Sequence, residues 1–418
     1  MDGLVKAMTT VPQAVETSPG KGKAAKEEKI EKKFTFSGQD YLEAVEAMEK
    51  YFLNHRMSDG FPMVPPTEAA VKRMMEGTDL PPDHAVSVLG PGNGTATVEK
   101  IAINAVMAGC LPQYMPVLIA ITEAIGSPEF DLRGCQTTTG PCSPVVIVSG
   151  WKLIQDLNIN YGFSSIGPGW RANSTIGRAM RLIMVNIGRS WPGVNDMKPA
   201  GMPIKFGIFF AENEPEYHGA WEPLNVAEGF NRDQPIVFVH VGSSIKTVQV
   251  GYTAEGTIRK YADEMRVGYG VYPWGYGPNV IVLSPTAFDL FREAGFSRAD
   301  LQKELFEQSR VPCTVFARAT SPETIQRELA KGPLVPRWVI NACKTNPQAL
   351  VPVVPKETDI KIIVSGGRSV DINMAMDSWG HASFAVAKPV KLPQGWSRLL
   401  EKYKGWETPI EIPKKARK

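Results

Sequence analysis

Apolar residues recur along the chain in two patterns, one typical of amphipathic helices and one typical of buried strands. Residues 37–57 place apolar side chains at a period of 3.6 residues, and Ser37 or Asp40 can cap the helix that this pattern predicts. Short apolar runs that end in glycine or in polar loops predict buried strands at 144–150, 204–214, 235–244 and 360–367. Because such strands alternate with helical segments, the sequence predicts an α/β fold with mainly parallel sheets.

Length and composition divide the chain into two folded halves between two polar tails. A chain of 418 residues exceeds an ordinary single domain, and we place a boundary near residue 250. Residues 1–35 are rich in alternating charge and poor in aromatic residues, which predicts a disordered tail. We therefore expect an N-terminal α/β domain over 36–250, a C-terminal α/β domain over 251–395, and a polar tail over 396–418.

Charge and hydropathy argue against nucleic acid and membrane as partners. The hydrophobic fraction of 43% and the net charge of +3 are ordinary for a globular protein. The most apolar stretch, 98–125, is interrupted by Pro112 and Pro116, so it predicts two buried helices rather than a membrane span. No signal-peptide pattern opens the chain and the five cysteines are odd in number, so we expect a cytoplasmic protein whose thiols are free, metal-bound or catalytic.

Two of the five cysteines lie close together in the stretch RGCQTTTGPCSP, at positions 135 and 142. A cysteine reacts as its thiolate, and the thiol pKa falls near cations and helix N-termini. The polar, Gly-Pro-rich setting favours a nucleophilic or redox role for Cys142 or Cys135. The alternative, in which both are inert core residues, stays open at this point.

A glycine-rich loop that leads into a helix, at 167–178, has the pattern of an anion-binding helix N-terminus. Backbone N–H groups and the helix dipole attract anions there, and Arg171 and Arg178 can hold a carboxylate or phosphate in two places. The first turn offers three more polar side chains, Asn173, Ser174 and Thr175. These residues are the predicted substrate-binding set, and a capped helix with surface arginines is the alternative interpretation.

The acidic stretch AENEPEYHGAWEPL, at 211–224, follows a run that predicts a buried strand. Carboxylates at the carboxyl ends of strands are where α/β enzymes place acid–base groups. Glu212 and His218 are therefore the predicted proton-transfer residues, and a solvated acidic loop is the alternative.

Five longer motifs lie in order between residues 40 and 390, and they are DGFPMVPPT, TATVEKIAINAVMAGC, GPGWRANSTIGRAMRL, FAENEPEYHGAWEPL and SPTAFDLFREAGFSRADLQKELFE. Together they resemble the UGSC-like (seleno)protein family of bacteria. Some members of that family are thought to carry a Sec-Gly-Ser-Cys motif, which implies redox or nucleophilic chemistry at that position. This chain contains no Cys-Gly-Ser-Cys, so no residue is carried over from the motif. The resemblance implies a fold and favours an enzyme without giving its reaction.

Three functional hypotheses follow from these features. The first is a cytoplasmic enzyme that acts on a small anionic substrate with a reactive cysteine thiol, either Cys142 or Cys135. The second is an iron–sulfur lyase or dehydratase with a cluster held by Cys110, Cys135 and Cys343, because cluster ligands need not be close in sequence. The third is a non-catalytic subunit or small-molecule binding protein. No motif specifies a cofactor, and we expect a homo-oligomer or a subunit of an enzyme complex.

The first hypothesis requires the candidate residues to meet at one place. Active sites of α/β enzymes lie outside the carboxyl ends of parallel strands. The expected strands end at Val148, Phe210, Val239 and Val364. We predict that the loops after them line one cleft between the two halves, with residues 173–175 on its floor and the loop 133–143 at its rim.

Overall fold

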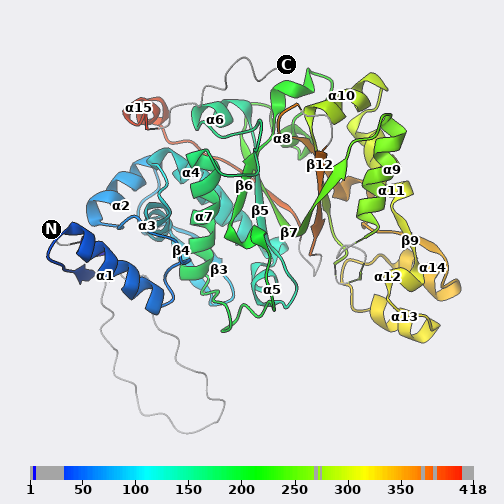
Figure 1. Cartoon of the computed structure of the whole chain (residues 1–418), viewed down its shortest axis with the longest axis horizontal. Helices are drawn as coiled ribbons and strands as arrows, with labels where there is room; N and C mark the ends of the chain where they lie inside the picture. Colours follow the sequence, from blue (N-terminus) through cyan, green and yellow to red (C-terminus); the bar gives the residue numbers. More distant parts are fainter. Residues whose placement is uncertain are drawn as a thin grey trace, which may run out of the picture.

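The computed structural model describes residues 33–267, 272–273, 275–368, 372–379 and 384–406, together with the backbone of residues 3–5. Helices and strands alternate along these segments, and the strands gather at the centre of the molecule between two groups of helices (Figure 1). The mixed α/β class that the sequence predicts is therefore confirmed.

One large sheet runs through the molecule, with the strand order β11-β8-β12-β7-β5-β6 and with β13 also paired to β7. Its strands are β5 (Ser143–Ser149), β6 (Ile208–Ala211), β7 (Ile236–Gln249), β8 (Asn279–Leu283), β11 (Ile360–Val364), β12 (Ile372–Ser378) and β13 (Val386–Pro389). The pairs β5/β6 and β8/β11 are parallel, whereas the other pairs are antiparallel. The prediction of mainly parallel sheets is thus wrong, because a strand that is buried on both faces has the same apolar pattern in either direction.

The sheet consists of two similar halves that meet at its centre. In the first half β5 and β6 are parallel neighbours and β7 returns antiparallel beside β5. In the second half β8, β11 and β12 repeat this arrangement, and β7 pairs with β12 between the halves. The boundary expected near residue 250 falls just after β7, so the segments on either side of it contribute to one sheet.

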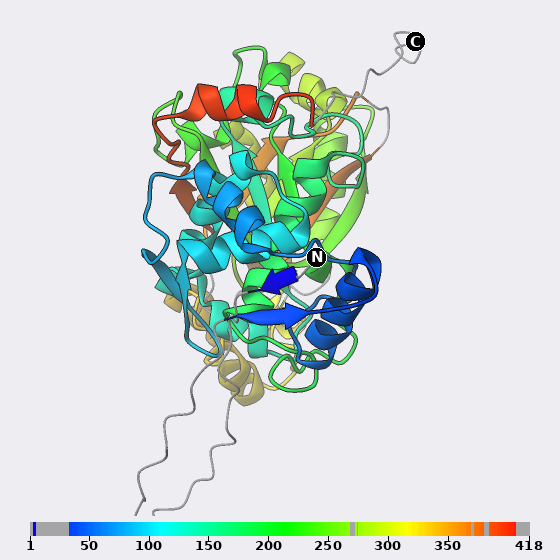
Figure 2. The ribbon, with the colours of Figure 1, turned by 90° about the vertical axis from the view of Figure 1, so that its left-hand side faces the viewer.

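Helices cover each half of the sheet. The first group includes α1 (Tyr41–Asn54), α2 (Glu68–Met74), α3 (Val98–Ala108), α4 (Met115–Ile125) and α7 (Arg171–Asn186). The second group includes α9 (Ala254–Met265), α10 (Pro285–Glu293), α11 (Arg298–Gln308), α12 (Cys313–Phe316), α13 (Pro322–Leu329) and α14 (Arg337–Thr345). Each group packs against its own half of the sheet in a large apolar core, and in Figure 2 the first group lies in front of the strands.

Several shorter elements complete the described chain. The remaining helices are α5 (Leu132–Thr137), α6 (Trp151–Asp156), α8 (Leu224–Ala227) and α15 (Trp396–Lys402). Three antiparallel strand pairs lie outside the large sheet: β1 (Gly3–Val5) with β2 (Phe34–Phe36), β3 (Ala85–Leu89) with β4 (Gly94–Thr97), and β9 (Arg310–Pro312) with β10 (Leu350–Pro352).

The large sheet is strongly curved. A third apolar core contains at least one residue from each of its six main strands, including Val145, Phe210, Phe238, Val280, Ile363 and Met376. The edge strands β6 and β11 lie at opposite ends of the strand order, yet both contribute to this core. The sheet must therefore curl around these residues, and this curvature brings its two edges together.

Two sequence-based predictions about helices in the first group are confirmed. Asp40 accepts a hydrogen bond from Glu43 N at the start of α1, which confirms one of its two predicted caps. Leu111 and the following short turn separate α3 from α4, so the prediction of two buried helices is also confirmed.

Within the described ranges, no helix is long and apolar enough to cross a bilayer.

Two features of the C-terminal half differ from the sequence-based expectations. The segment expected to begin a polar tail forms α15, where the buried Trp396 donates its Nε1–H to Asp156 Oδ2 at 2.9 Å. Cys313 and Cys343 form a disulfide between α12 and α14. The prediction that all five thiols are free, metal-bound or catalytic is therefore wrong for this pair, since a separation of 30 residues carries no sequence pattern that would mark it.

Candidate functional site

The two edge strands of the sheet meet where they end. Asn213 N, just after β6, donates to Val364 O at the end of β11 at 2.7 Å. Ser365 Oγ donates back to Ala211 O at 2.7 Å. This junction places the carboxyl ends of β6 and β11 side by side, although the two strands are far apart in sequence.

Part of the predicted convergence of loops is present at this junction. Glu212 N donates to Val148 O at 2.9 Å, so the carboxyl end of β5 joins those of β6 and β11. The loop after Val239 does not take part, because β7 continues to Gln249 and runs antiparallel to β5. Three of the four predicted strand ends therefore lie together, and the fourth does not.

The start of α7 is attached to the same junction through Asn173. Its side chain accepts from Asn160 N at 2.8 Å and donates to Asn160 O and Ser165 O, both at 3.0 Å. Ser165 Oγ in turn lies 2.9 Å from Ser365 Oγ. Asn173 thus lies buried in the first turn of α7, which begins at Arg171, and orders the loop before the helix.

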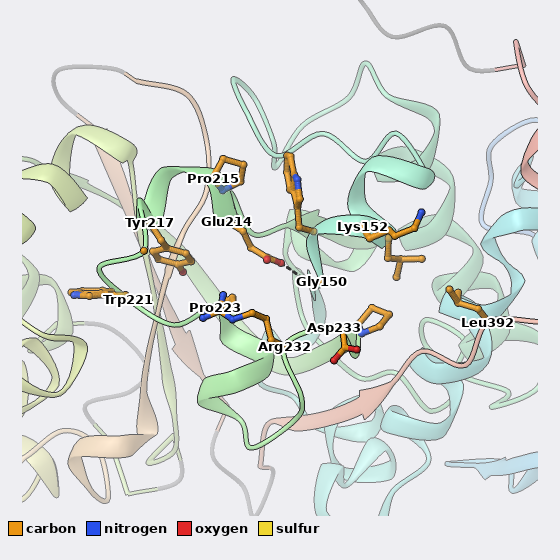
Figure 3. A pocket seen from close by; sticks show the side chains of 14 residues that line it. Gly150, Lys152, Glu214, Pro215, Tyr217, Trp221, Pro223, Arg232, Asp233 and Leu392 are labelled. Atoms are coloured by element: carbon orange, nitrogen blue, oxygen red, sulfur yellow. Dashed lines mark hydrogen bonds between the residues drawn. The ribbon is translucent and has the colours of Figure 1, made fainter. Parts of the chain in front are cut away.

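A pocket of about 620 Å³ opens beside the junction, between the loop after β5 and the loop after β6. Its walls are largely apolar and include Trp151, Tyr217, Trp221, Pro223, Pro235 and Leu392. Lys152, Glu214, Arg232 and Asp233 supply the charged groups. Figure 3 shows the Glu214 side chain reaching from the loop after β6 toward Gly150, with Arg232 and Asp233 on the other side of the pocket. An apolar pocket with a few convergent polar groups is the usual form of a small-molecule site.

Glu214 has an unusual environment for a carboxylate. Its Oε1 accepts a hydrogen bond of 2.5 Å from Gly150 N, where β5 leads into α6. Burial and the nearby charge of Glu212 raise the pKa of Glu214 to about 7, although the bond from Gly150 and the charge of Arg232 oppose this rise. A carboxyl group that titrates near neutral pH can both accept and donate a proton.

Glu212, which the sequence marks as a proton-transfer residue, does not line this pocket. Its side chain is fully buried, and its carboxylate accepts from Leu224 N at 2.9 Å and from the Tyr217 hydroxyl. Burial raises the pKa of Glu212 above its usual value. The side chain thus holds the loop of residues 213–224 in place behind the pocket, which is a positioning role.

His218, the second predicted proton-transfer residue, lies on the surface of the same loop. Its Nε2 is 3.2 Å from Arg368 Nη2 and 3.5 Å from Glu216 Oε2. The side chain is half exposed and does not line the pocket of Glu214.

The predicted anion-binding arginines of α7 have other partners. Arg178 forms a two-pronged ion pair with Asp59, through Nε at 2.7 Å and Nη2 at 3.0 Å. This contact neutralises the guanidinium and fixes the loop before α2. Arg171 is exposed, with its guanidinium 6.0 Å from the ring centre of Trp406.

Only part of the predicted anion site comes together, and it does so away from the pocket of Glu214. Thr175 Oγ1 donates to Arg171 O within the helix at 2.8 Å. Ser174 is exposed and lines a different pocket of about 570 Å³, together with Asn173 and Arg178. The predicted anion site at the N-terminus of α7 is therefore separate from the pocket of Glu214.

Cys135 and Cys142 contact each other at the opposite end of β5. Their sulfur atoms lie 3.7 Å apart and both side chains are buried. The hydrogen bond from Cys142, together with the nearby charge of Lys198, lowers the pKa of Cys135, whereas burial raises the pKa of Cys142 well above its usual value.

The direction of β5 keeps these thiols away from the pocket of Glu214. Cys142 directly precedes the strand and Gly150 directly follows it. A strand of seven residues spans roughly 23 Å at about 3.3 Å per residue. The prediction of one cleft with the loop 133–143 at its rim is therefore wrong, and Cys142 and Glu212 cannot act on one small substrate.

The three cysteines proposed to hold an iron–sulfur cluster do not come together. Cys343 is in the disulfide with Cys313, and Cys110 donates its thiol to Thr175 O at 3.3 Å. In the part of the chain that the structure describes, no three His, Cys, Asp or Glu side chains are grouped to hold a metal ion. The prediction of this ligand set is wrong.

Sequence reasoning missed the residues that form the pocket around Glu214. Glu214 lies in the acidic stretch that drew attention to Glu212 and His218, but only the fold decides which carboxylate faces a pocket. Arg232 and Gly150 come from separate loops and carry no motif, so no sequence signal connects them with Glu214.

Comparison of the chain with protein-family models, with curated proteins and with solved structures gives no match. The resemblance to the UGSC-like family therefore stays a prediction, and the site is interpreted from its own geometry.

Proposed function

We propose that this protein is an enzyme that binds a small anionic substrate in the pocket beside the junction and transfers a proton through Glu214. The observation that carries the proposal is the position of Glu214, a partly buried carboxyl group with a pKa of about 7 on the wall of a pocket of about 620 Å³. Strongly shifted carboxyl groups in pockets are typical of catalytic acids and bases.

The surroundings of Glu214 suit an anion with an apolar body. Arg232 and Lys152 line the pocket with largely exposed side chains, and they form ion pairs with Glu222 and Asp156 respectively. Exposed ion pairs are weak, so a substrate carboxylate can replace the present partner at small cost. The aromatic and proline walls would exclude water from the bound substrate. These features favour a proton-transfer reaction, such as that of a lyase or isomerase.

Substrate binding gives a first test. We expect a screen of small carboxylates and phosphates by calorimetry to find a ligand whose affinity falls about tenfold in Arg232→Gln, the loss expected for one partly exposed charge-assisted hydrogen bond. Arg327→Gln, which removes an exposed arginine on α13, is the matched control and should leave the affinity unchanged.

A ligand that binds equally well to Arg232→Gln would contradict the proposed orientation of the substrate. A ligand that binds as expected but is never converted would instead support the third hypothesis, a small-molecule binding protein. Failure of every anion in the screen to bind would remove the basis of the proposal.

The contact between Cys135 and Cys142 favours a second candidate function, thiol–disulfide exchange. Both thiols are buried, so the loop of residues 133–143 would first have to open. The exposed thiolate of Cys135 would then attack a small disulfide such as glutathione disulfide and release one glutathione thiolate. Cys142 would then attack the mixed disulfide and release the second. The protein loses two electrons and two protons, and the external disulfide becomes two thiols. The sulfur separation of 3.7 Å is short enough for the new bond to form with small side-chain movements.

Mass spectrometry can test this exchange directly. After incubation with glutathione disulfide, we expect the mass of the protein to fall by two hydrogen atoms. When the protein is then alkylated in denaturant, Cys135 and Cys142 should no longer be modified. Cys110, whose thiol is also buried, is the internal control and should remain fully alkylated. A Cys135→Ser variant should instead form no internal disulfide besides the one between Cys313 and Cys343. If wild-type Cys135 and Cys142 both stay alkylated, the exchange does not occur.

A further inference from the structure

Three cations surround one buried carboxylate in the segment that follows α7. Asp196 Oδ2 lies 2.7 Å from Lys205 Nζ and 3.4 Å from Arg181 Nη2, and its Oδ1 lies 3.4 Å from Lys198 Nζ. The side chains of Asp196 and Lys198 are 1% and 2% exposed. We refer to Arg181, Asp196, Lys198 and Lys205 as the basic cluster.

The three cations of the basic cluster differ in how many of their N–H groups have a hydrogen-bond acceptor. Lys198 Nζ also donates to Cys135 O at 2.9 Å and to Gln136 O at 3.2 Å, which satisfies its three N–H groups. The side-chain hydrogen bonds of Arg181 and Lys205 within the described residues both go to Asp196 Oδ2. Several donors of these two cations are therefore left for another acceptor.

The charges of the basic cluster do not balance. Its three cations face one carboxylate, and Asp59, which lines the same pocket, is occupied by Arg178. Burial and the neighbouring cations Arg181 and Lys198 lower the pKa of Lys205, although Asp196 opposes this change. An excess of positive charge in a partly dehydrated place is costly unless an anion compensates it.

A pocket of about 550 Å³ gives access to this excess charge. Arg181 and Lys205 form part of its wall, and both are partly exposed. Trp191, Met202 and Phe206 supply an apolar wall, and the Phe206 side chain is 64% exposed. Gly201 lies beside Lys205, and a Cβ atom there would stand 3.6 Å from Lys205 Nζ. The pocket thus has two positively charged residues, Arg181 and Lys205, beside an apolar wall.

We propose that the basic cluster and the apolar residues beside it form a binding site for a small organic anion. The carboxylate of the ligand lies between Arg181 and Lys205 and supplies the missing negative charge. Its apolar or aromatic body packs against Trp191, Met202 and Phe206. Carboxylates pair well with the fork of an arginine and with a lysine ammonium group.

This site is distinct from the pocket of Glu214. Lys198 contacts the backbone of Cys135, which lies before β5, whereas the pocket of Glu214 begins at Gly150 after this strand. The two pockets share no lining residue. The inference therefore stands or falls independently of the proposed enzyme activity.

Calorimetry with benzoate, benzamide and inorganic phosphate tests the proposal on the full chain. We expect benzoate to bind saturably and benzamide, which has the same shape without the charge, to bind at least tenfold more weakly. Lys205→Met should weaken benzoate binding by a factor of about 10 or more, and Lys205→Arg should retain it. Lys331→Met, which removes a surface lysine that follows α13, is the control and should bind benzoate as the wild type does.

Each of the other outcomes overturns the proposal. Equal binding of benzoate and benzamide would show that charge is not recognised. Unchanged benzoate affinity in Lys205→Met would place the ligand elsewhere. If the affinity falls, circular dichroism of this variant and of Lys205→Arg distinguishes loss of binding from loss of folding. Binding of phosphate without benzoate would mean that the apolar wall plays no part in recognition.

Discussion

Glu214→Gln should lower kcat on the substrate of the pocket by a factor of about 10²–10⁴ and leave KM nearly unchanged. The glutamine side chain has the same shape, and its amide oxygen can still accept the hydrogen bond from Gly150 N. It cannot take up or release a proton near neutral pH, so only the chemical step is lost. Steady-state kinetics over a range of pH measure both effects, and Glu293→Gln, which changes an exposed carboxylate on α10 outside the pocket, is the control.

The pH dependence of stability supplies a second readout for the same variant. The pKa of Glu214 rises from 4.5 to about 7 on folding, so its ionisation opposes the folded state. Its contribution to stability is complete below pH 4.5 and is lost as the pH rises through 7. Glutamine does not titrate, so the variant does not lose this stability. Between pH 4.5 and pH 8 the free energy of unfolding of Glu214→Gln should therefore rise relative to that of the wild type, by at most about 3 kcal/mol.

Urea unfolding of both proteins at several pH values measures this shift. Curves that stay parallel from pH 5 to pH 8 would mean that Glu214 has an ordinary pKa. A normal kcat in Glu214→Gln with an intact fold would contradict the catalytic role itself, whatever the pKa.

The sequence predicts the elements of this fold better than their arrangement. Apolar periodicity and caps such as Asp40 identify helices and strands, because these signals are local. The direction of a strand depends on its partners. The run at 235–244 is buried on both faces, and nothing in its pattern distinguishes a parallel strand from the antiparallel β7.

The candidate site illustrates a similar limit. Glu212 and Glu214 are two residues apart, and the sequence favours the first because it directly follows β6. In the fold Glu212 turns into the core and Glu214 reaches Gly150 on another loop. The separation of Cys142 from Glu212 was, in contrast, accessible from sequence. Cys142 precedes its strand and Glu212 follows its own, so two parallel strands must place them at opposite ends.

Asp196→Asn is expected to lower the free energy of unfolding by about 4 kcal/mol, the usual cost of removing one partner from a buried ion pair. The variant keeps the shape of the side chain but leaves the cations Arg181, Lys198 and Lys205 without a negative partner. Asp289→Asn is the control, because Asp289 also contacts two arginines but lies nearer the surface. Its loss should cost less than about 1 kcal/mol.

Urea unfolding of the two variants measures these costs, and added benzoate links them to the proposed anion site. Without Asp196 the excess positive charge of the basic cluster grows, so benzoate should bind Asp196→Asn more tightly than wild type and recover part of the lost stability. At the same concentration, benzoate should stabilise Asp289→Asn by no more than it stabilises the wild type. A cost below about 1 kcal/mol for Asp196→Asn would mean that water, rather than Asp196, compensates the three cations.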